Sequence, residues 1–335
     1  MRLCVKPLGW RPGCLTHETS KLPFPERPNF NVSVAPQAAP LPLNSHKLSL
    51  PMIARIALPS LTLVVALLAG SMLPAKVSAE PPRKPMVADL YVDMGAGKPG
   101  DAMTPQLLDA MTHGVGGTWS MRRGPEKTDT PLAEFTVSAA KGHLPVPVSV
   151  NGVIHKNAGN QRGWACEMAS PVRCVTYTFK TPHPAVSVGF FLEYHGTKAW
   201  TPLDLVCINS GDDFVVMNTR EHPQTPGVRV HTGDRSPDNK PKPSRAGPVI
   251  PLEDGKLYWV SMRFTQHGDS SLALFDPKTF EQIGPTSTLT LTSNTPARMI
   301  QIGRCDKHPG VIPPTTLYWN DFVADWTTAR FPLLP

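Results

Sequence analysis

Alternation of apolar and polar residues is the clearest pattern in this chain. In the run Leu257–Thr265, one face collects Tyr258, Val260, Met262 and Phe264, and the other collects Trp259, Ser261, Arg263 and Thr265. The run Ser287–Thr292 alternates more strictly, with Leu289 and Leu291 on one face and threonines on the other. A period of two residues is typical of a strand with one buried face.

Other short runs rich in β-branched and aromatic residues predict further strands. They cover Asp89–Asp93, Glu134–Ser138, Val146–Val150, Val175–Lys180, Ser187–Tyr194, Leu203–Ile208, Phe214–Asn218, Val228–His231, Leu272–Phe275, Met299–Gly303 and Leu317–Trp326. The pair Asn151-Gly152 predicts a two-residue turn. Thr104 as N-cap before Pro105, with Gly114 as a stop, predicts one short helix. Many short strands and one helix predict an all-β antiparallel sandwich of two sheets.

The N-terminal part does not show this pattern. Residues 52–79 begin with Met52 and Arg55, continue through an apolar run and end in Val77-Ser78-Ala79, which is typical of a signal peptide cleaved after Ala79. An uncleaved membrane anchor is the alternative. Residues 1–51 are interpreted as a disordered leader or a mis-called upstream extension. We therefore expect an exported protein with one β domain at 80–335, in the periplasm, at the cell surface or in the medium.

Charge excludes one class of partner. The chain has 33 basic and 26 acidic residues, of which residues 1–79 hold 8 and 2, so that 25 and 24 remain. A nearly neutral domain has no basic stripe that could hold phosphates, and we expect no nucleic-acid partner.

Four cysteines remain after residue 79, and in an oxidising compartment an even number predicts disulfides. Cys166 and Cys174 are close in sequence and flank a turn-like Ala169-Ser170-Pro171, which favours that pair. Cys207 and Cys305 lie in strand-like runs and are equally compatible with free thiols. No Cys-x-x-Cys or His-Glu-x-x-His motif indicates a zinc site.

Three stretches in order carry a family resemblance. They are the opening Asp89–Asp93 followed by Gly95 and Gly97, the paired strands of Gly255–Ile283, and the closing Leu317–Pro332 with Trp319-Asn320-Asp321. This order resembles laminin-G-like and other concanavalin A-like domains over residues 86–332. The resemblance implies a jelly-roll sandwich. It also implies a calcium ion where the first and last strands meet, at Asp93 and Asp321, although both carboxylates could instead be solvated or cap turns.

Catalytic motifs are sparse. Glycoside hydrolases of this fold carry two acidic residues on one strand, in a pattern such as Glu-x-Asp-x-Glu, and no such run exists here. Tyr194, His195 and Arg263 are residue types used by polysaccharide lyases, but their spacing does not show that they converge. An enzyme with an atypical site therefore stays an alternative.

Sugar-binding sites combine aromatic side chains with polar groups, and two stretches offer both. One contains Tyr194, His195, Trp200 and Asp204, and the other is Trp164 beside Asn160-Gln161-Arg162. Both tryptophans could instead be core residues or loop anchors, since large aromatic side chains are usually substantially buried. We expect a non-catalytic carbohydrate-binding or cell-surface interaction module whose partner is a glycan, with no membrane span after signal cleavage. A polysaccharide-cleaving enzyme and a structural envelope protein are the alternatives.

Overall fold

The structure is a computed structural model that describes residues 84–123, 126–128, 132–139, 141–156, 162–167, 173–196, 203–210, 214–220, 227–232, 245–292, 295–305 and 315–335. They all belong to one compact unit, Val77–Pro335. The predicted leader and signal peptide lie outside the described residues. No helix within those residues is long and apolar enough to cross a membrane.

The larger sheet, sheet I, has ten strands in the described part of the chain. Its main path runs in the order β20 (Gln282–Thr292), β19 (His267–Phe275), β18 (Leu257–Thr265), β12 (Ala185–Gly196), β22 (Thr315–Asp325), β10 (Arg162–Glu167), β7 (Leu132–Ala139) and β3 (Ala102–Met103). Two short strands extend it from β22, β2 (Leu90–Val92) and then β4 (Thr112–His113). Every pairing in this sheet is antiparallel.

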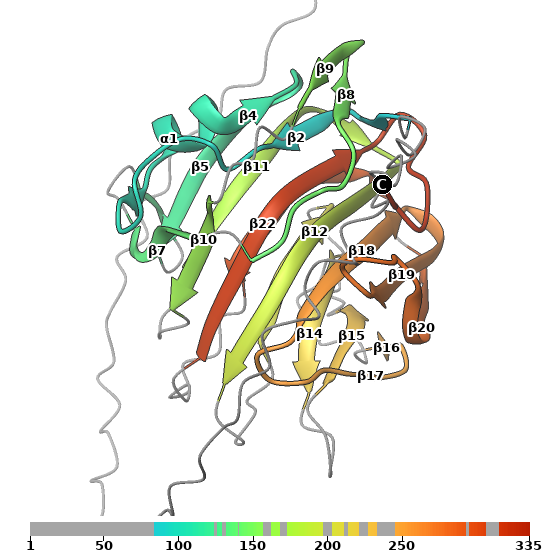
Figure 1. The fold of residues 1–335 in the computed structure, drawn as a ribbon. Coiled ribbons are helices and arrows are strands. Elements are labelled where there is room, and N and C mark those ends of the chain that lie inside the picture. The colour runs from blue at the N-terminus through green and yellow to red at the C-terminus, as the bar shows by residue number, and fades with distance from the viewer. Residues whose placement is uncertain are drawn as a thin grey trace, which may run out of the picture. The chain divides into compact units, whose positions relative to one another are not determined.

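Sheet II faces it with nine described strands. Its order is β16 (Arg245–Ala246), β15 (Gly227–Thr232), β14 (Phe214–Arg220), β13 (Asp204–Asn209), β21 (Ala297–Arg304), β11 (Arg173–His183), β5 (Gly117–Arg123) and β6 (Glu126–Thr128), with β17 (Ile250–Pro251) paired to β15. The main core lies between the two sheets, and Figure 1 shows their curved strands. The predicted all-β jelly-roll sandwich is confirmed.

Local signals in the sequence located the small elements correctly. Helix α1 (Pro105–Met111) begins after Thr104, whose Oγ1 accepts a hydrogen bond from the Leu107 backbone N–H at 3.0 Å. It ends at Met111, three residues before the expected stop. Asn151 and Gly152 both have positive φ, 51° and 78°, and join β8 (Val148–Val150) to β9 (Val153–His155) as a tight hairpin turn.

A third layer covers part of the outer face of sheet I. The hairpin β8–β9 pairs through β8 with β1 (Met86–Ala88), in parallel, to form a three-stranded sheet. Side chains of this layer and of the C-terminal segment form a second core with outward residues of sheet I, including Phe191 and Val323. Trp259 and Ser261, on the face of their strand that points away from the main core, are therefore completely buried.

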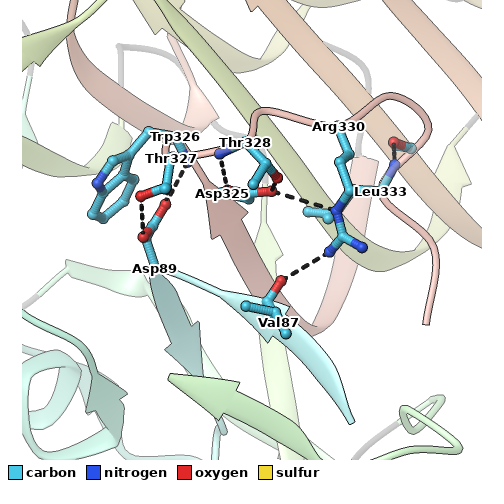
Figure 2. A network of polar contacts seen from close by, with 9 residues as sticks. Val87, Asp89, Asp325, Trp326, Thr327, Thr328, Arg330 and Leu333 are labelled. Atoms are coloured by element: carbon cyan, nitrogen blue, oxygen red, sulfur yellow. Dashed lines mark hydrogen bonds and ion pairs between the residues drawn. The ribbon is translucent and has the colours of Figure 1, made fainter. Parts of the chain in front are cut away.

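The C-terminal segment is fastened to the first strands by a polar network, which Figure 2 shows from close by. The carboxylate of Asp89, just after β1, accepts the backbone N–H groups of Trp326 and Thr327, both at 2.7 Å. Arg330 donates to the Val87 carbonyl oxygen at 3.0 Å and lies 3.6 Å from the Asp325 carboxylate. These bonds join the two ends of the domain.

Candidate functional site

A polar and aromatic cluster lies on the outer face of sheet I. Along β12 the even-numbered residues Val186 to Tyr194 point into the main core, so Glu193 and His195 share the opposite face. On β22 the inward residues are Leu317 and Trp319, and Tyr318 therefore points outward, directly across from Glu193 in the register. Two neighbouring strands thus bring a carboxylate, an imidazole and a phenol ring together.

Glu193 is the centre of the cluster. Its Oε1 lies 2.6 Å from His195 Nε2 and 3.2 Å from Lys141 Nζ. The Glu193 side chain is only 11% exposed, whereas His195 and Lys141 are 42% and 39% exposed. The buried carboxylate therefore holds two solvent-accessible nitrogen groups above the sheet. Charge-assisted hydrogen bonds of this kind restrict the geometry of their donors.

Tyr318 provides a half-buried aromatic surface in the same cluster. Lys141 Nζ lies 4.8 Å from the centroid of its ring, and the His195 ring meets it edge-on at 5.6 Å. A cation over an aromatic face gains electrostatic attraction from the ring quadrupole. An aromatic ring surrounded by hydrogen-bonding groups is an arrangement that can hold a sugar, because apolar and hydroxyl faces of a pyranose find different partners.

A β-bulge places Lys141 over this face. The register between β12 and β22 shifts next to Asn320 and Asp321, and Asp321 has a φ of +44°. Asn320 Nδ2 donates to the Gly142 carbonyl oxygen, and Asp321 Oδ2 accepts the Leu144 backbone N–H at 2.7 Å. The segment leading into β8 is thereby held across β22, as Figure 1 shows.

Gly142 is required where this segment crosses the sheet. A Cβ added at this position would lie 2.8 Å from the Phe191 ring. The turn before β18 approaches from the other side, where Asp254 Oδ1 accepts the Gly196 backbone N–H at 2.8 Å. The cluster of Lys141, Glu193, His195 and Tyr318 therefore sits between two fixed backbone segments.

The register argues against a two-carboxylate hydrolase centre built from Glu193 and Glu134. Glu193 pairs with Tyr318, Tyr318 with Ala165, and Ala165 with Thr136, two residues from Glu134. Three strand spacings and an offset of two residues separate the two glutamate positions by about 16 Å. Paired catalytic carboxylates of glycosidases lie about 5 to 9.5 Å apart.

The structure separates the residues that the sequence suggested for ligand binding. His195 belongs to the cluster. Tyr194 points into the main core, where burial raises the pKa of its phenol to about 12. Asp204 lies on sheet II and accepts a hydrogen bond from Asn218 at 2.7 Å. Trp164 has no exposed surface and packs in the main core, as the alternative interpretation expected. Trp200 lies outside the described residues.

The expected disulfide between Cys166 and Cys174 is not present, because Cys174 is a free thiol. The two cysteines belong to different sheets. Cys166 on β10 pairs with Leu317 in sheet I, whereas Cys174 on β11 pairs with Gly303 in sheet II. Closeness in sequence was misleading because the intervening segment connects opposite layers of the sandwich. Cys207 and Cys305 are also free thiols.

The two carboxylates expected to bind calcium have protein partners. Asp93 accepts the Gly95 backbone N–H at 2.8 Å, and its Oδ2 lies 2.7 Å from His113 Nε2. Asp321 accepts the Tyr91 hydroxyl at 3.2 Å in addition to Leu144. Burial and the nearby charge of Asp321 raise the pKa of Tyr91. Within the described ranges, no three His, Cys, Asp or Glu side chains gather as metal ligands. Calcium binding stays a prediction.

Sequence reasoning missed three residues of the cluster. Glu193 could have been found, because it lies two positions before His195 on a predicted strand and must share its face. Lys141 and Tyr318 carried no such signal. Their positions depend on the register of β22 and on the crossing segment, which join parts of the chain that are far apart in sequence.

Comparisons with known proteins give no family. No protein-family profile and no curated protein matches the chain. One solved structure that resembles it comes from work on botulinum neurotoxin type C, whose cell entry depends on interaction with two ganglioside molecules. The identity is 11%, the similarity covers 63% of this chain and 47% of that chain, and the TM-score is 0.36. Another is the binding domain of botulinum neurotoxin serotype D, at 11% identity, 63% and 48% coverage and a TM-score of 0.35.

A mutant of the GH43 protein BlXynB from Bacillus licheniformis also resembles it, at 8% identity, 59% and 38% coverage and a TM-score of 0.37. The chain spans about half or less of the length of these structures. Similarity at this level carries no information about the ligand of this chain.

Proposed function

We propose that this protein is an exported, non-catalytic carbohydrate-binding module that holds a glycan at Lys141, Glu193, His195 and Tyr318. The observation that carries the proposal is the position of an accessible imidazole and an accessible ammonium group beside a half-buried phenol ring, all organised by one buried carboxylate. Sugar hydroxyls can accept from Lys141 and exchange hydrogen bonds with His195, while the Tyr318 ring offers an apolar edge or face.

The rigidity of the cluster supports binding. Its groups come from two paired strands and from a segment fastened by the side chains of Asn320 and Asp321. A site built on strands is already ordered before the ligand arrives, so that less conformational entropy is lost on binding.

A glycan-array screen of the full chain, followed by calorimetry on the best ligand, tests this proposal. We expect Tyr318→Ala to cost about 2 kcal/mol, or roughly 30-fold in Kd, because tyrosines at the centre of binding sites often contribute this much. His195→Ala should also weaken binding. The matched control is His267→Ala, since His267 is exposed at the start of β19, away from the cluster on β12 and β22.

Trp200→Ala forms a separate arm, because Trp200 is the aromatic residue that the sequence suggested. If the single variants Trp200→Ala and Tyr318→Ala both lose binding, the site includes Trp200 as well as the cluster. The proposal is wrong if a folded wild-type protein binds no glycan, or if binding survives both His195→Ala and Tyr318→Ala unchanged.

A polysaccharide-cleaving enzyme is the second candidate, and the short contact between Glu193 and His195 favours it. Two titratable groups within 2.6 Å can transfer a proton between them and a substrate. Prolonged incubation with bound polysaccharides, followed by measurement of new reducing ends and of unsaturated products, separates the two functions. A product that disappears with Glu193→Gln would support the enzyme.

A further inference from the structure

Three free thiols gather on the outer face of sheet II. Cys174 on β11 lies opposite Gly303 on β21, and Cys207 on β13 lies opposite Gln301 on the same strand. Because Gln301, Gly303 and Cys305 alternate along the chain, all three thiols share the face that points away from the main core. Cys174 and Cys207 are buried there, and Cys305 is partly exposed.

Cys174 has an environment that favours its thiolate. A hydrogen bond from the Cys305 thiol is the largest cause that lowers the pKa of Cys174, with further contributions from Thr176, Arg122 and Gln301 that outweigh burial. The Thr176 Oγ1 and Gln301 Nε2 atoms lie 3.9 and 3.6 Å from the sulfur. Burial raises the pKa of Cys207 and of Cys305.

The backbone allows the Cys174 and Cys305 sulfurs to approach. Cys305 lies one residue beyond the end of β21, where its backbone N–H donates to the Asp204 carbonyl oxygen at 2.9 Å and its thiol donates to the Gly303 carbonyl oxygen at 3.2 Å. Gly303, directly across from Cys174, has no side chain that would separate the two thiols. Its φ of 113° lies in a region that glycine adopts without strain.

The geometry points to a dithiol–disulfide couple formed by Cys174 and Cys305, a redox modification site on sheet II that is independent of the glycan site. The oxidant is a low-molecular-weight disulfide, RSSR. The partly exposed Cys305 thiol passes its proton to the neighbouring Cys174 thiolate and attacks one sulfur of RSSR, which releases RS⁻ and leaves a mixed disulfide on Cys305. Cys174 passes that proton to the released RS⁻, which becomes RSH, and the Cys174 thiolate then attacks the Cys305 sulfur and releases the second RS⁻. In total, two electrons and one proton pass from the protein to RSSR, which gives RSH and RS⁻.

Peptide mapping after oxidation of the full chain tests this pairing. The folded protein is reduced, equilibrated in glutathione buffers of increasing redox potential, treated with a maleimide and digested with trypsin. Cleavage after Arg173, Lys180, Arg304 and Lys307 places Cys174 in residues 174–180 and Cys305 in residues 305–307, while Cys166 and Cys207 fall in other peptides. Every pairing among these four cysteines therefore has its own mass.

We expect peptides 174–180 and 305–307 to lose their maleimide label in parallel and to appear joined, with two hydrogens fewer. Cys207→Ser should leave this product unchanged. Cys174→Ser should instead leave glutathione attached to Cys305, because the attacking thiolate is missing. Cys174 joined to Cys166 or Cys207, or both peptides still labelled under the most oxidising buffer, would overturn the assignment. The wild-type protein decides this even where a variant does not fold.

Discussion

Asp321 is the side chain whose loss should disturb both the fold and the candidate site. It is 1% exposed, and its two oxygens accept the Leu144 backbone N–H and the Tyr91 hydroxyl. In Asp321→Ala, both donors lose their acceptor in the interior. Each bond to a charged acceptor contributes about 1.5–3 kcal/mol, and alanine at a φ of +44° adds about 1 kcal/mol of backbone cost.

The expected loss in Asp321→Ala is therefore about 4–7 kcal/mol, a large part of the roughly 5–15 kcal/mol that stabilises a folded domain. Asp321→Asn should lose about half as much, because asparagine tolerates this φ and keeps one carbonyl oxygen as acceptor. Urea unfolding followed by tryptophan fluorescence measures both values. The control is Asp109→Ala on the exposed face of α1, which should change stability by less than about 0.5 kcal/mol.

A loss below about 1 kcal/mol in Asp321→Ala would refute this reasoning, because it would mean that the segment from Lys141 to Leu144 is not held by Asp321. The same variant should also weaken glycan binding, since Lys141 depends on this segment for its position. Retained affinity in a destabilised protein would separate the two roles of Asp321 and would place the binding site elsewhere.

Other predictions concern the pH, packing, metal and helix properties of the fold. Burial alone would raise the pKa of Asp325, but hydrogen bonds from Thr328 and Ala329 and the charge of Arg330 hold it below its usual range. The stabilisation that the Asp325 carboxylate contributes is therefore present above a pH of about 4 and is lost as the pH falls through its pKa in the folded protein. Urea unfolding midpoints of Asp325→Asn should depend less on pH in this range than those of the wild type. Gly189→Ala would bring a Cβ within 2.5 Å of the Trp259 ring, so thermal unfolding should show a loss of about 1–3 kcal/mol. If calcium binds, it should raise the Tm of the wild type and not of Asp93→Asn in a thermal-shift titration. Thr104→Ala removes a helix N-cap and should cost about 1 kcal/mol in urea unfolding.

Features that depend on local chemistry could be predicted from the sequence. The inward face of Leu257–Thr265, the N-cap at Thr104 and the Asn151-Gly152 turn all follow from spacing or from residue type, and the structure has each of them where expected. Such features need only the geometry of a few consecutive residues, which the amino-acid order determines directly.

The tertiary structure decided which faces are covered and which distant residues meet. Alternation shows that Trp259 and Ser261 share a face, but only the third layer explains why both are buried. The cluster around Glu193 and the pairing of Cys174 with sheet II depend on strand register between segments more than 100 residues apart. Register is chosen by the packing of whole sheets, so no local pattern in the sequence contains it.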